Sequence, residues 1–261
     1  MTKRFGFTLA EVLITLGIIG VVAAMSIPTL IANTNSAKFK SQFKKTIATL
    51  NQAALMSQAQ YDFDFAGATA DSDLKNLDPK ANSSVAAMLA GTLSGVTITD
   101  QSPYKAAKAT EPTEPTGMTI ESKGYAKLAD GSLLVFNMKK GAANVDSSGN
   151  VTRASGAGSN AAFACTVEPG TAPDKYIKAL ATAGCAGWID VNGPTSPNAE
   201  SVCDDASITG LYAGEGTASK SKVCTVKGDA AHTHDVYPVV YHDGIVEPAT
   251  YAGRAILSAA K

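Results

Sequence analysis

The sequence predicts an α+β protein in which one long N-terminal helix is followed by antiparallel hairpins and a loop-rich C-terminal region. The first observation is an apolar run at residues 12–31 that leads directly into an amphipathic helical pattern. The second is a pair of turn signals, Asp130-Gly131 and Asp243-Gly244, each flanked by strand-like segments. The third is an even number of cysteines, four, all from Cys165 onward, which predicts disulfide stabilisation of that region.

The composition leaves room for only a thin core. The chain has 261 residues and 45% of them are hydrophobic, but 44 residues are alanine. Charged residues make up 17%, below the roughly 25% of an ordinary soluble domain, and collagen, coiled coil and charge-driven disorder are excluded. The net charge of -1 is too balanced for the basic surface that a phosphate backbone requires. Nucleic acid is therefore not expected as a partner.

The apolar run has the length of a membrane span. Residues 12–37 carry no charge, and about 20 apolar residues cross a hydrocarbon core of roughly 30 Å. A secretory signal peptide has a shorter apolar stretch and a small-residue cleavage site, so we expect this segment to be retained. Lys3 and Arg4 place the N-terminus in the cytoplasm by the positive-inside rule, although the lysines that follow weaken the bias: Lys38, Lys40, Lys44 and Lys45.

Glu11 is the unusual residue of this segment, because a carboxylate inside an apolar helix is costly. Insertion scales give about 2.5–3.5 kcal/mol for the comparable Asp at the bilayer centre. Glu11 lies near the start of the run, so its side chain either extends to the lipid headgroups or pairs with another group.

The residues around Glu11 resemble a known processing signal. Lys3-Arg4-Phe5-Gly6, then Phe7-Thr8-Leu9-Ala10-Glu11 and the apolar helix closely resemble the class III signal of type IV pilins and type II secretion pseudopilins. The resemblance extends from residue 3 to about residue 60. It implies that a prepilin peptidase cleaves after Gly6 and methylates the new terminal Phe7. It also implies that Glu11 pairs in a filament with the N-terminal amine of a neighbouring subunit, since a buried ion pair sets register.

The helix is expected to continue well beyond the membrane, to about residue 60. Apolar positions recur at spacings of three and four, as in an amphipathic helix: Phe39, Phe43, Ile47, Leu50 and Ala54. Glycine and proline weaken a helix, so Gly17, Gly20 and Pro28 predict a kink or local melting. In the resembled family such a glycine and proline, here Gly20 and Pro28, bracket a segment that unwinds in the filament.

These features divide the chain into a cleaved leader at 1–6, a helix at 7–60 and a globular head at 61–261. Within the helix, 7–31 is the transmembrane and assembly part and 32–60 is the amphipathic part. The resemblance implies a pilin-like fold, in which the helix packs on a small antiparallel β-sheet.

Residues 61–118 of the head are expected to form a variable connection, with a helix signal at 83–90 and a proline-rich turn at 111–117. The remaining expectations are hairpins at 125–136 and 236–246, an exposed loop or weak hairpin at 141–160, a helix at 174–182 and a strand at 188–191. The phrase at 187–198 also resembles a strand-and-turn phrase that recurs in pilin-like proteins.

The cysteines are expected to form two disulfides on the side facing an oxidising compartment. Three connectivities are possible, and sequence alone does not choose among them. We favour Cys165 with Cys185 and Cys203 with Cys224, because each pair closes a local loop beside a thin core. Zinc is disfavoured, because the spacings lack a C-x-x-C pair.

Two further groups could carry chemistry. Asp190, Asn192, Asp204 and Asp205 supply hard oxygen ligands for calcium, which some pseudopilins bind in a C-terminal loop, but solvated loop acids are the alternative. Three histidines near acidic residues are the only candidates for acid–base work: His232, His234 and His242. No H-E-x-x-H pattern or nucleophile elbow accompanies them in the sequence, so catalysis is not expected.

The resulting expectation is a structural subunit of a type IV pilus or type II secretion pseudopilus, and not an enzyme. Its partners would be itself and other pilin-like subunits, prepilin peptidase, and the inner membrane before assembly, with the head periplasmic. The alternatives are a minor or tip pilin with an adhesive role, and a membrane-anchored periplasmic binding domain.

Overall fold

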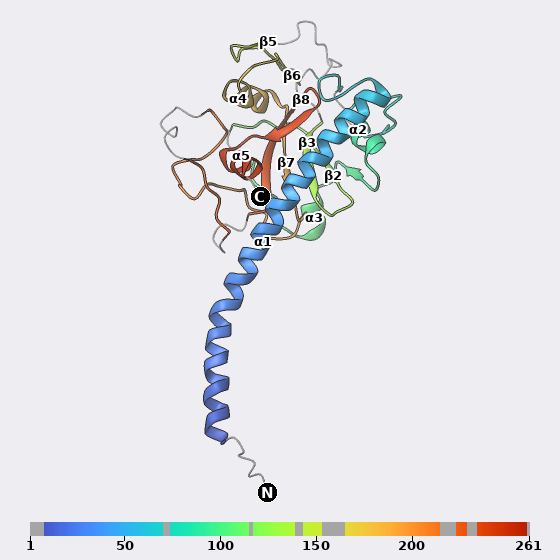
Figure 1. The fold of residues 1–261 in the computed structure, drawn as a ribbon. Helices are drawn as coiled ribbons and strands as arrows, with labels where there is room; N and C mark the ends of the chain where they lie inside the picture. The colour runs from blue at the N-terminus through green and yellow to red at the C-terminus, as the bar shows by residue number, and fades with distance from the viewer. Residues whose placement is uncertain are drawn as a thin grey trace.

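The chain forms a head on a long helical stalk in the computed structural model (Figure 1). The structure describes residues 8–69, 74–114, 117–138, 143–152, 165–214, 223–228 and 234–259. The leader at 1–6 and Phe7 lie outside the described residues, as do His232 and most of the second half of the loop expected at 141–160.

The stalk is α1, Leu9–Tyr61, which continues into the head. Its 53 residues correspond to about 80 Å of helix. The first buried residue is Ala32, and from there the predicted amphipathic stripe is confirmed, since all its members are buried in the head: Phe39, Phe43, Ile47, Leu50 and Ala54. The helix ends at Tyr61, where Asp62 takes the left-handed conformation with φ 63°. The second half of α1 is thus the central core helix of the head.

A six-stranded antiparallel sheet packs against α1, as the predicted α+β fold requires (Figure 1). Its strand order is β1-β2-β3-β7-β8-β9. The strands are β1 Thr97–Thr99, β2 Lys123–Lys127, β3 Leu133–Asn137, β7 Ala186–Asp190, β8 Val236–His242 and β9 Ile245–Pro248. Both predicted hairpins, β2–β3 and β8–β9, are confirmed. Gly187 permits the close approach of β7 to β3, because a Cβ there would lie 2.0 Å from the Val135 carbonyl oxygen.

The segment at 61–118, expected as a variable connection, covers parts of the sheet, and the helix expected at 83–90 is present. The helix α2, Val85–Thr92, packs beside α1, and the short α3, Pro103–Ala107, brings the buried Tyr104 to a second apolar cluster with Tyr125 and Trp188. Successive side chains of β3 point to opposite faces of the sheet. Leu134 and Phe136 therefore pack in the core beside α1, whereas Leu133 and Val135 pack in this second cluster. Sequence patterning does not predict α3, because a five-residue helix has no usable periodicity.

Glu111 fastens this covering segment, although the sequence suggests only a turn or linker there. Its carboxylate accepts hydrogen bonds from Ser102 Oγ at 2.9 Å and Tyr125 Oη at 3.0 Å, and pairs with Lys123 Nζ at 2.9 Å. Lys123 also lies 4.9 Å from the centroid of the Trp188 ring. These contacts hold the chain over the face of the sheet opposite α1.

The C-terminal region adds a small sheet and two helices. The small sheet has the order β5-β4-β6, from β4 Ala143–Val145, β5 Val151–Thr152 and β6 Cys165–Val167. Of the two alternatives expected within 141–160, an exposed loop or a weak hairpin, β4 and β5 form the hairpin. Helix α4, Pro173–Ala183, matches the predicted helix. Helix α5, Tyr251–Ser258, is not among the predicted elements, although Thr250 caps its first turn through the Gly253 amide. Disulfides join Cys165 to Cys185 and Cys203 to Cys224, which is the favoured pairing.

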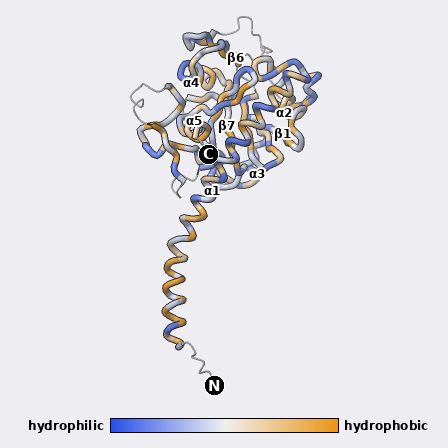
Figure 2. The backbone as a smooth tube through the Cα atoms, in the orientation of Figure 1, coloured by the Kyte–Doolittle hydropathy of each residue, from blue (hydrophilic) through white to orange (hydrophobic). Residues whose placement is uncertain are grey.

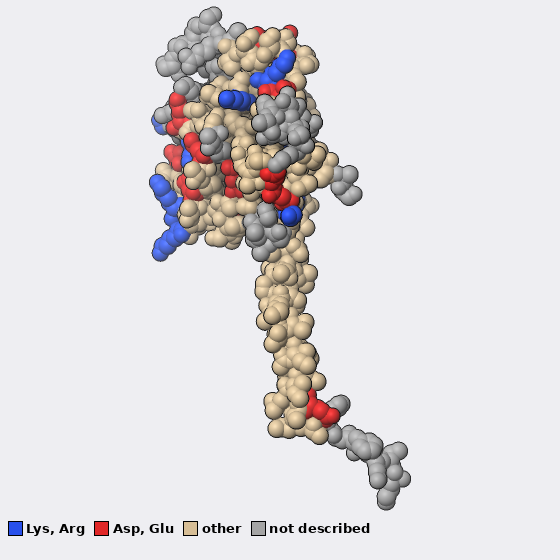
Figure 3. Space-filling view, turned by 90° about the vertical axis from the view of Figure 1, so that its left-hand side faces the viewer, with Lys and Arg blue, Asp and Glu red and all other residues tan. Residues whose placement is uncertain are grey.

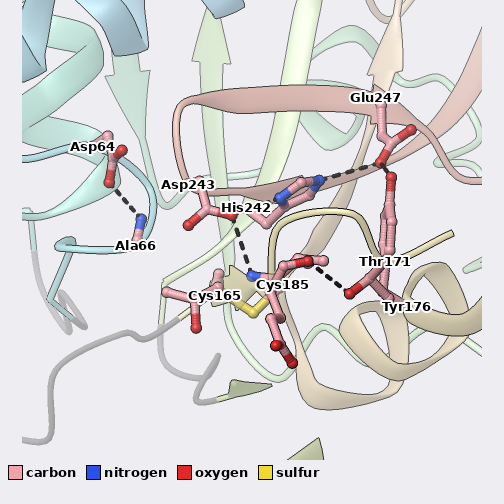
Figure 4. Close-up of polar contacts among 12 residues, drawn as sticks. Asp64, Ala66, Cys165, Thr171, Tyr176, Cys185, His242, Asp243 and Glu247 are labelled. Atoms are coloured by element: carbon pink, nitrogen blue, oxygen red, sulfur yellow. Dashed lines mark hydrogen bonds and ion pairs between the residues drawn. A yellow bond between two sulfur atoms is a disulfide. The ribbon is translucent and has the colours of Figure 1, made fainter. Parts of the chain in front are cut away.

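An ionic cluster centred on the buried His242 connects these C-terminal elements (Figure 4). The ring Nδ1 of His242 lies 2.9 Å from the Asp243 carboxylate and Nε2 lies 3.2 Å from Glu247. Glu247 also accepts a short hydrogen bond from Tyr176 on α4 and a 2.7 Å contact from Arg254 on α5. The β9 edge is thereby tied to both helices.

The charges in this cluster support one another. Burial alone would lower the pKa of His242, but hydrogen bonds and charge from Asp243 and Glu247 raise it to about 9. Burial would raise the pKa of Glu247, but hydrogen bonds from His242, Tyr176 and Arg254 hold it below its usual value. The imidazolium and carboxylate forms are therefore both favoured at neutral pH.

The packing of α1 predicts a clear contrast between two positions on the same helix. Phe43 is fully buried and stacks on Tyr237 with ring centroids 4.1 Å apart, whereas Leu55 is 65% exposed. We expect Phe43→Ala to lower the free energy of unfolding by about 3–5 kcal/mol and Leu55→Ala to change it by no more than about 0.5 kcal/mol. Chemical denaturation of the full-length protein in detergent measures both, and equal losses would contradict the assignment of the core face.

The His242 cluster predicts a pH-dependent stability. Because the folded pKa of about 9 lies above the ordinary pKa of 6.5, the stabilisation is fully present below pH 6.5 and is lost as the pH rises through about 9. The difference in unfolding free energy between the wild type and His242→Gln should therefore shrink by on the order of 3 kcal/mol between pH 6 and pH 10. Urea titrations at the two pH values test this, and a pH-independent difference would show that His242 does not titrate as described.

Candidate functional site

The candidate functional site is the free half of α1, which projects from the head as an exposed apolar helix. Figure 2 shows this half as mostly hydrophobic along its length. Large side chains there are between 44% and 81% exposed: Leu9, Val12, Leu13, Ile14, Leu16, Ile18, Ile19, Val21, Val22, Met25, Ile27, Leu30 and Ile31. The helix is long and apolar enough to cross a membrane, and its most apolar stretch makes no buried contact within the described part of the chain. Apolar surface of this extent requires a non-aqueous environment or a partner.

Glu11 is the one charged residue in the stretch 8–37. Figure 3 shows a single acidic patch close to the free end of an otherwise uncharged stalk. Glu11 therefore carries the one charge of this stretch, four residues along the chain from Phe7, at which the expected processing would create a new N-terminus.

Glu11 also caps the N-terminus of α1. This local role is separate from the filament contact expected from the sequence. Thr8 is the N-cap of α1, and its side-chain oxygen accepts the Glu11 amide at 3.3 Å. The Glu11 carboxylate in turn accepts the Thr8 amide and the Thr8 hydroxyl, both at 2.8 Å. The Thr-x-x-Glu spacing of this capping box is readable in the sequence and is the signal that could have revealed it.

Gly20 and Pro28 do not interrupt the helix in the single chain. Helix α1 is continuous through Gly17, Gly20 and Pro28, and it bends gently below the head in Figure 1 instead of breaking. A Cβ atom placed on Gly17 or Gly20 would meet no atom within 4 Å outside the helix itself. These residues therefore lie where no tertiary contact from the described residues supports the helix.

The four residues considered for calcium are not assembled into one site. Asp190 is fully buried and accepts a 2.7 Å hydrogen bond from Tyr104, and Asn192 donates its amide to the same carboxylate at 3.3 Å. Burial raises the pKa of Asp190 to about 7. Asp204 instead accepts the Lys227 amide at 2.8 Å, and Asp205 accepts the Ser207 amide at 2.9 Å. Across the described ranges, no group of three His, Cys, Asp or Glu residues could hold a metal ion.

Asp235 is a second buried carboxylate at this turn, and its charge adds to the rise in the pKa of Asp190. Sequence reasoning did not identify its role at the turn. Its buried carboxylate accepts the amides of Asn198 at 2.9 Å and Ala199 at 2.8 Å, which lie 37 and 36 residues away. Burial raises its pKa. Asp190 and Asp235 thus hold the two ends of the turn that follows β7, which gives the phrase at 187–198 a structural role.

Of the three histidines considered for acid–base work, the structure describes His234 and His242. His232 lies outside the described residues, and Tyr237 Oη donates to the His234 carbonyl at 3.1 Å. His242 is 6% exposed, and both of its ring nitrogens contact carboxylates. His242 therefore stabilises the head and is not placed to exchange protons with a substrate.

Comparison with known proteins identifies the N-terminal segment. Residues 1–27 match the family model described as the prokaryotic N-terminal methylation motif. No curated protein and no solved structure matches the chain. The motif and α1, which among the described residues is the one helix long and apolar enough to span a membrane, fit membrane anchoring followed by incorporation into a surface filament. The head has the α+β, disulfide-containing form of a pilin-like fold. Through residues 1–27, the chain carries the signature of the type IV pilins and pseudopilins, whose members are structural subunits.

Proposed function

We propose that this protein is a structural subunit of a type IV pilus or a type II secretion pseudopilus, polymerised through the free half of α1. The observation that carries the proposal is the exposed apolar half of α1, most of which lies within the methylation motif at residues 1–27. About 20 apolar residues are stable in lipid before assembly and against the same helices of other subunits afterwards. In this function the protein is a substrate of processing and has no catalytic role of its own.

The proposed sequence of events begins in the inner membrane, with the N-terminus in the cytoplasm and the head in the periplasm. Prepilin peptidase cleaves after Gly6 and methylates Phe7, which leaves a charged amine next to the Thr8 cap. In the filament this amine meets Glu11 of a neighbouring subunit. The surroundings there are apolar helices, so the pair acts by fixing register more than by adding stability.

Two alternatives lead to different expectations. The loop-rich head is compatible with a minor or tip subunit that carries an adhesive role. A membrane-anchored periplasmic binding domain would use α1 only as an anchor, so its activity would survive replacement of residues 9–31 by an unrelated membrane span. A filament subunit would fail to assemble after the same replacement.

The processing step predicts a defined mature N-terminus. Protein isolated from its native membrane or from a sheared surface fraction should begin with N-methylated Phe7, and peptide mass spectrometry determines this directly. An intact Met1 would contradict the proposal and would favour the anchored domain.

The Glu11 capping box makes two substitutions informative. Glu11 is the third residue of the helix, where glutamine also forms a capping box and alanine does not. Both substitutions remove the negative charge. We expect both Glu11→Ala and Glu11→Gln to be cleaved normally and to reduce filament yield by at least tenfold. The comparison uses sheared filament yield and the ratio of precursor to mature protein. Normal filaments from Glu11→Gln would contradict the charge pair, and a loss of filaments confined to Glu11→Ala would assign the effect to the cap.

A further inference from the structure

The segment at residues 223–228 lies against α1 immediately above the free half of the helix. The carbonyl oxygen of Lys227 accepts hydrogen bonds from Ser36 Oγ at 3.5 Å and Lys40 Nζ at 3.1 Å. Lys40 also donates to the carbonyl of Val226, so its ammonium group bridges two successive carbonyls. Ser36 and Lys40 are four residues apart and therefore share one face of α1. The segment thus binds two adjacent turns of the helix.

Other contacts keep this segment in place. The disulfide between Cys203 and Cys224 fixes its start. Asp204 donates its amide to the Thr225 carbonyl at 2.9 Å, and its carboxylate accepts both Thr225 Oγ1 and the Lys227 amide at 2.8 Å. The segment therefore presents its carbonyls to α1 from a frame that is both covalent and hydrogen-bonded. This is the role that the structure gives to Asp204, which the sequence suggests as a calcium ligand.

The contact also marks a change in the environment of α1. Ser36 is 2% exposed, whereas Leu30 and Ile31, one turn or so earlier, are 66% and 54% exposed. Burial lowers the pKa of Lys40, while the nearby Asp204 carboxylate opposes that shift. Helices depend on tertiary packing for most of their stability, so the free half is the less stable part of α1. The boundary between the two parts coincides with residues 223–228.

We propose that residues 223–228 form a strap that fixes α1 at Ser36 and Lys40 and stops conformational change in the free half from spreading into the head. Gly17, Gly20 and Pro28 all lie on the unsupported side of the strap. Because the Cys203–Cys224 disulfide holds it, the strap is released when that bond is lost. The inference concerns α1 and the head of a single chain and does not depend on filament assembly.

Hydrogen–deuterium exchange of the full-length chain in detergent tests the strap. Lys40→Met removes the ammonium group and keeps the length of the side chain, and amides at 33–40 should then exchange at least tenfold faster. Lys44→Met is the matched control, because Lys44 donates at 2.8 Å to the Ala259 carbonyl, away from the strap. It should leave the exchange of 33–40 unchanged.

The paired variant Cys203→Ser/Cys224→Ser should accelerate the same amides, since it frees the start of the strap. Amides of β8 in the centre of the head report global unfolding in each variant. Faster exchange confined to 33–40 and the strap supports the proposal. Unchanged exchange at 33–40, or acceleration there only in proportion to β8, would overturn it.

Discussion

The structure depends on one helix that occupies two environments. From Ala32 onward α1 is the core of the head, and before that point its apolar side chains have no partner among the described residues of the chain. The two halves cannot be exchanged, since Phe43 and Leu50 are fully buried while Leu13 and Ile14 are more than half exposed. The head therefore fixes the orientation of the free half of α1. The environment or partner that covers this half determines the function of the protein.

A thin core explains the form of the rest of the head. Alanine is abundant, so fewer large side chains are available for burial than the apolar fraction suggests. The C-terminal region accordingly relies on other connections: two disulfides, the His242 cluster between α4 and α5, and the Asp190 and Asp235 carboxylates that hold the turn after β7. The disulfides close loops of 20 and 21 residues, and the contacts of Asp190 with Tyr104, Asp235 with Ala199 and Glu247 with Tyr176 join residues 86, 36 and 71 positions apart, so they oppose the conformational entropy of the chain.

Whether a contact is local or long-range along the chain also determines how much of the molecule can be predicted from the sequence. The α1 stripe and the hairpins at Gly131 and Gly244 have local periodicity or turn chemistry, and local patterns predict them. The roles of Glu111 and Asp235 depend on partners that the fold brings together, which local patterns do not encode. The carboxylates beside His242 lie one and five residues away in the same hairpin, but the contact of Glu247 with Tyr176 on α4 is not encoded locally. The Thr8–Glu11 cap is a local pattern that the sequence does show. It was missed because a charge in an apolar helix directs attention to a distant partner and away from the neighbouring Thr8.

That cap changes the energetics of the proposed assembly. In the single chain the Glu11 carboxylate already accepts two hydrogen bonds from Thr8, so it is not an unsatisfied charge waiting for a partner. A neighbouring amine must either displace these contacts, at a cost of about 0.5–2 kcal/mol for a lost cap, or use the remaining lone pairs of the carboxylate. The second route keeps α1 helical from Leu9 and places the amine beside the positive end of the helix, where Glu11 offsets an otherwise unfavourable charge. Glu11 would then act on the helix end and on the neighbouring subunit at once, which gives a physical reason for a carboxylate at this position in an apolar helix.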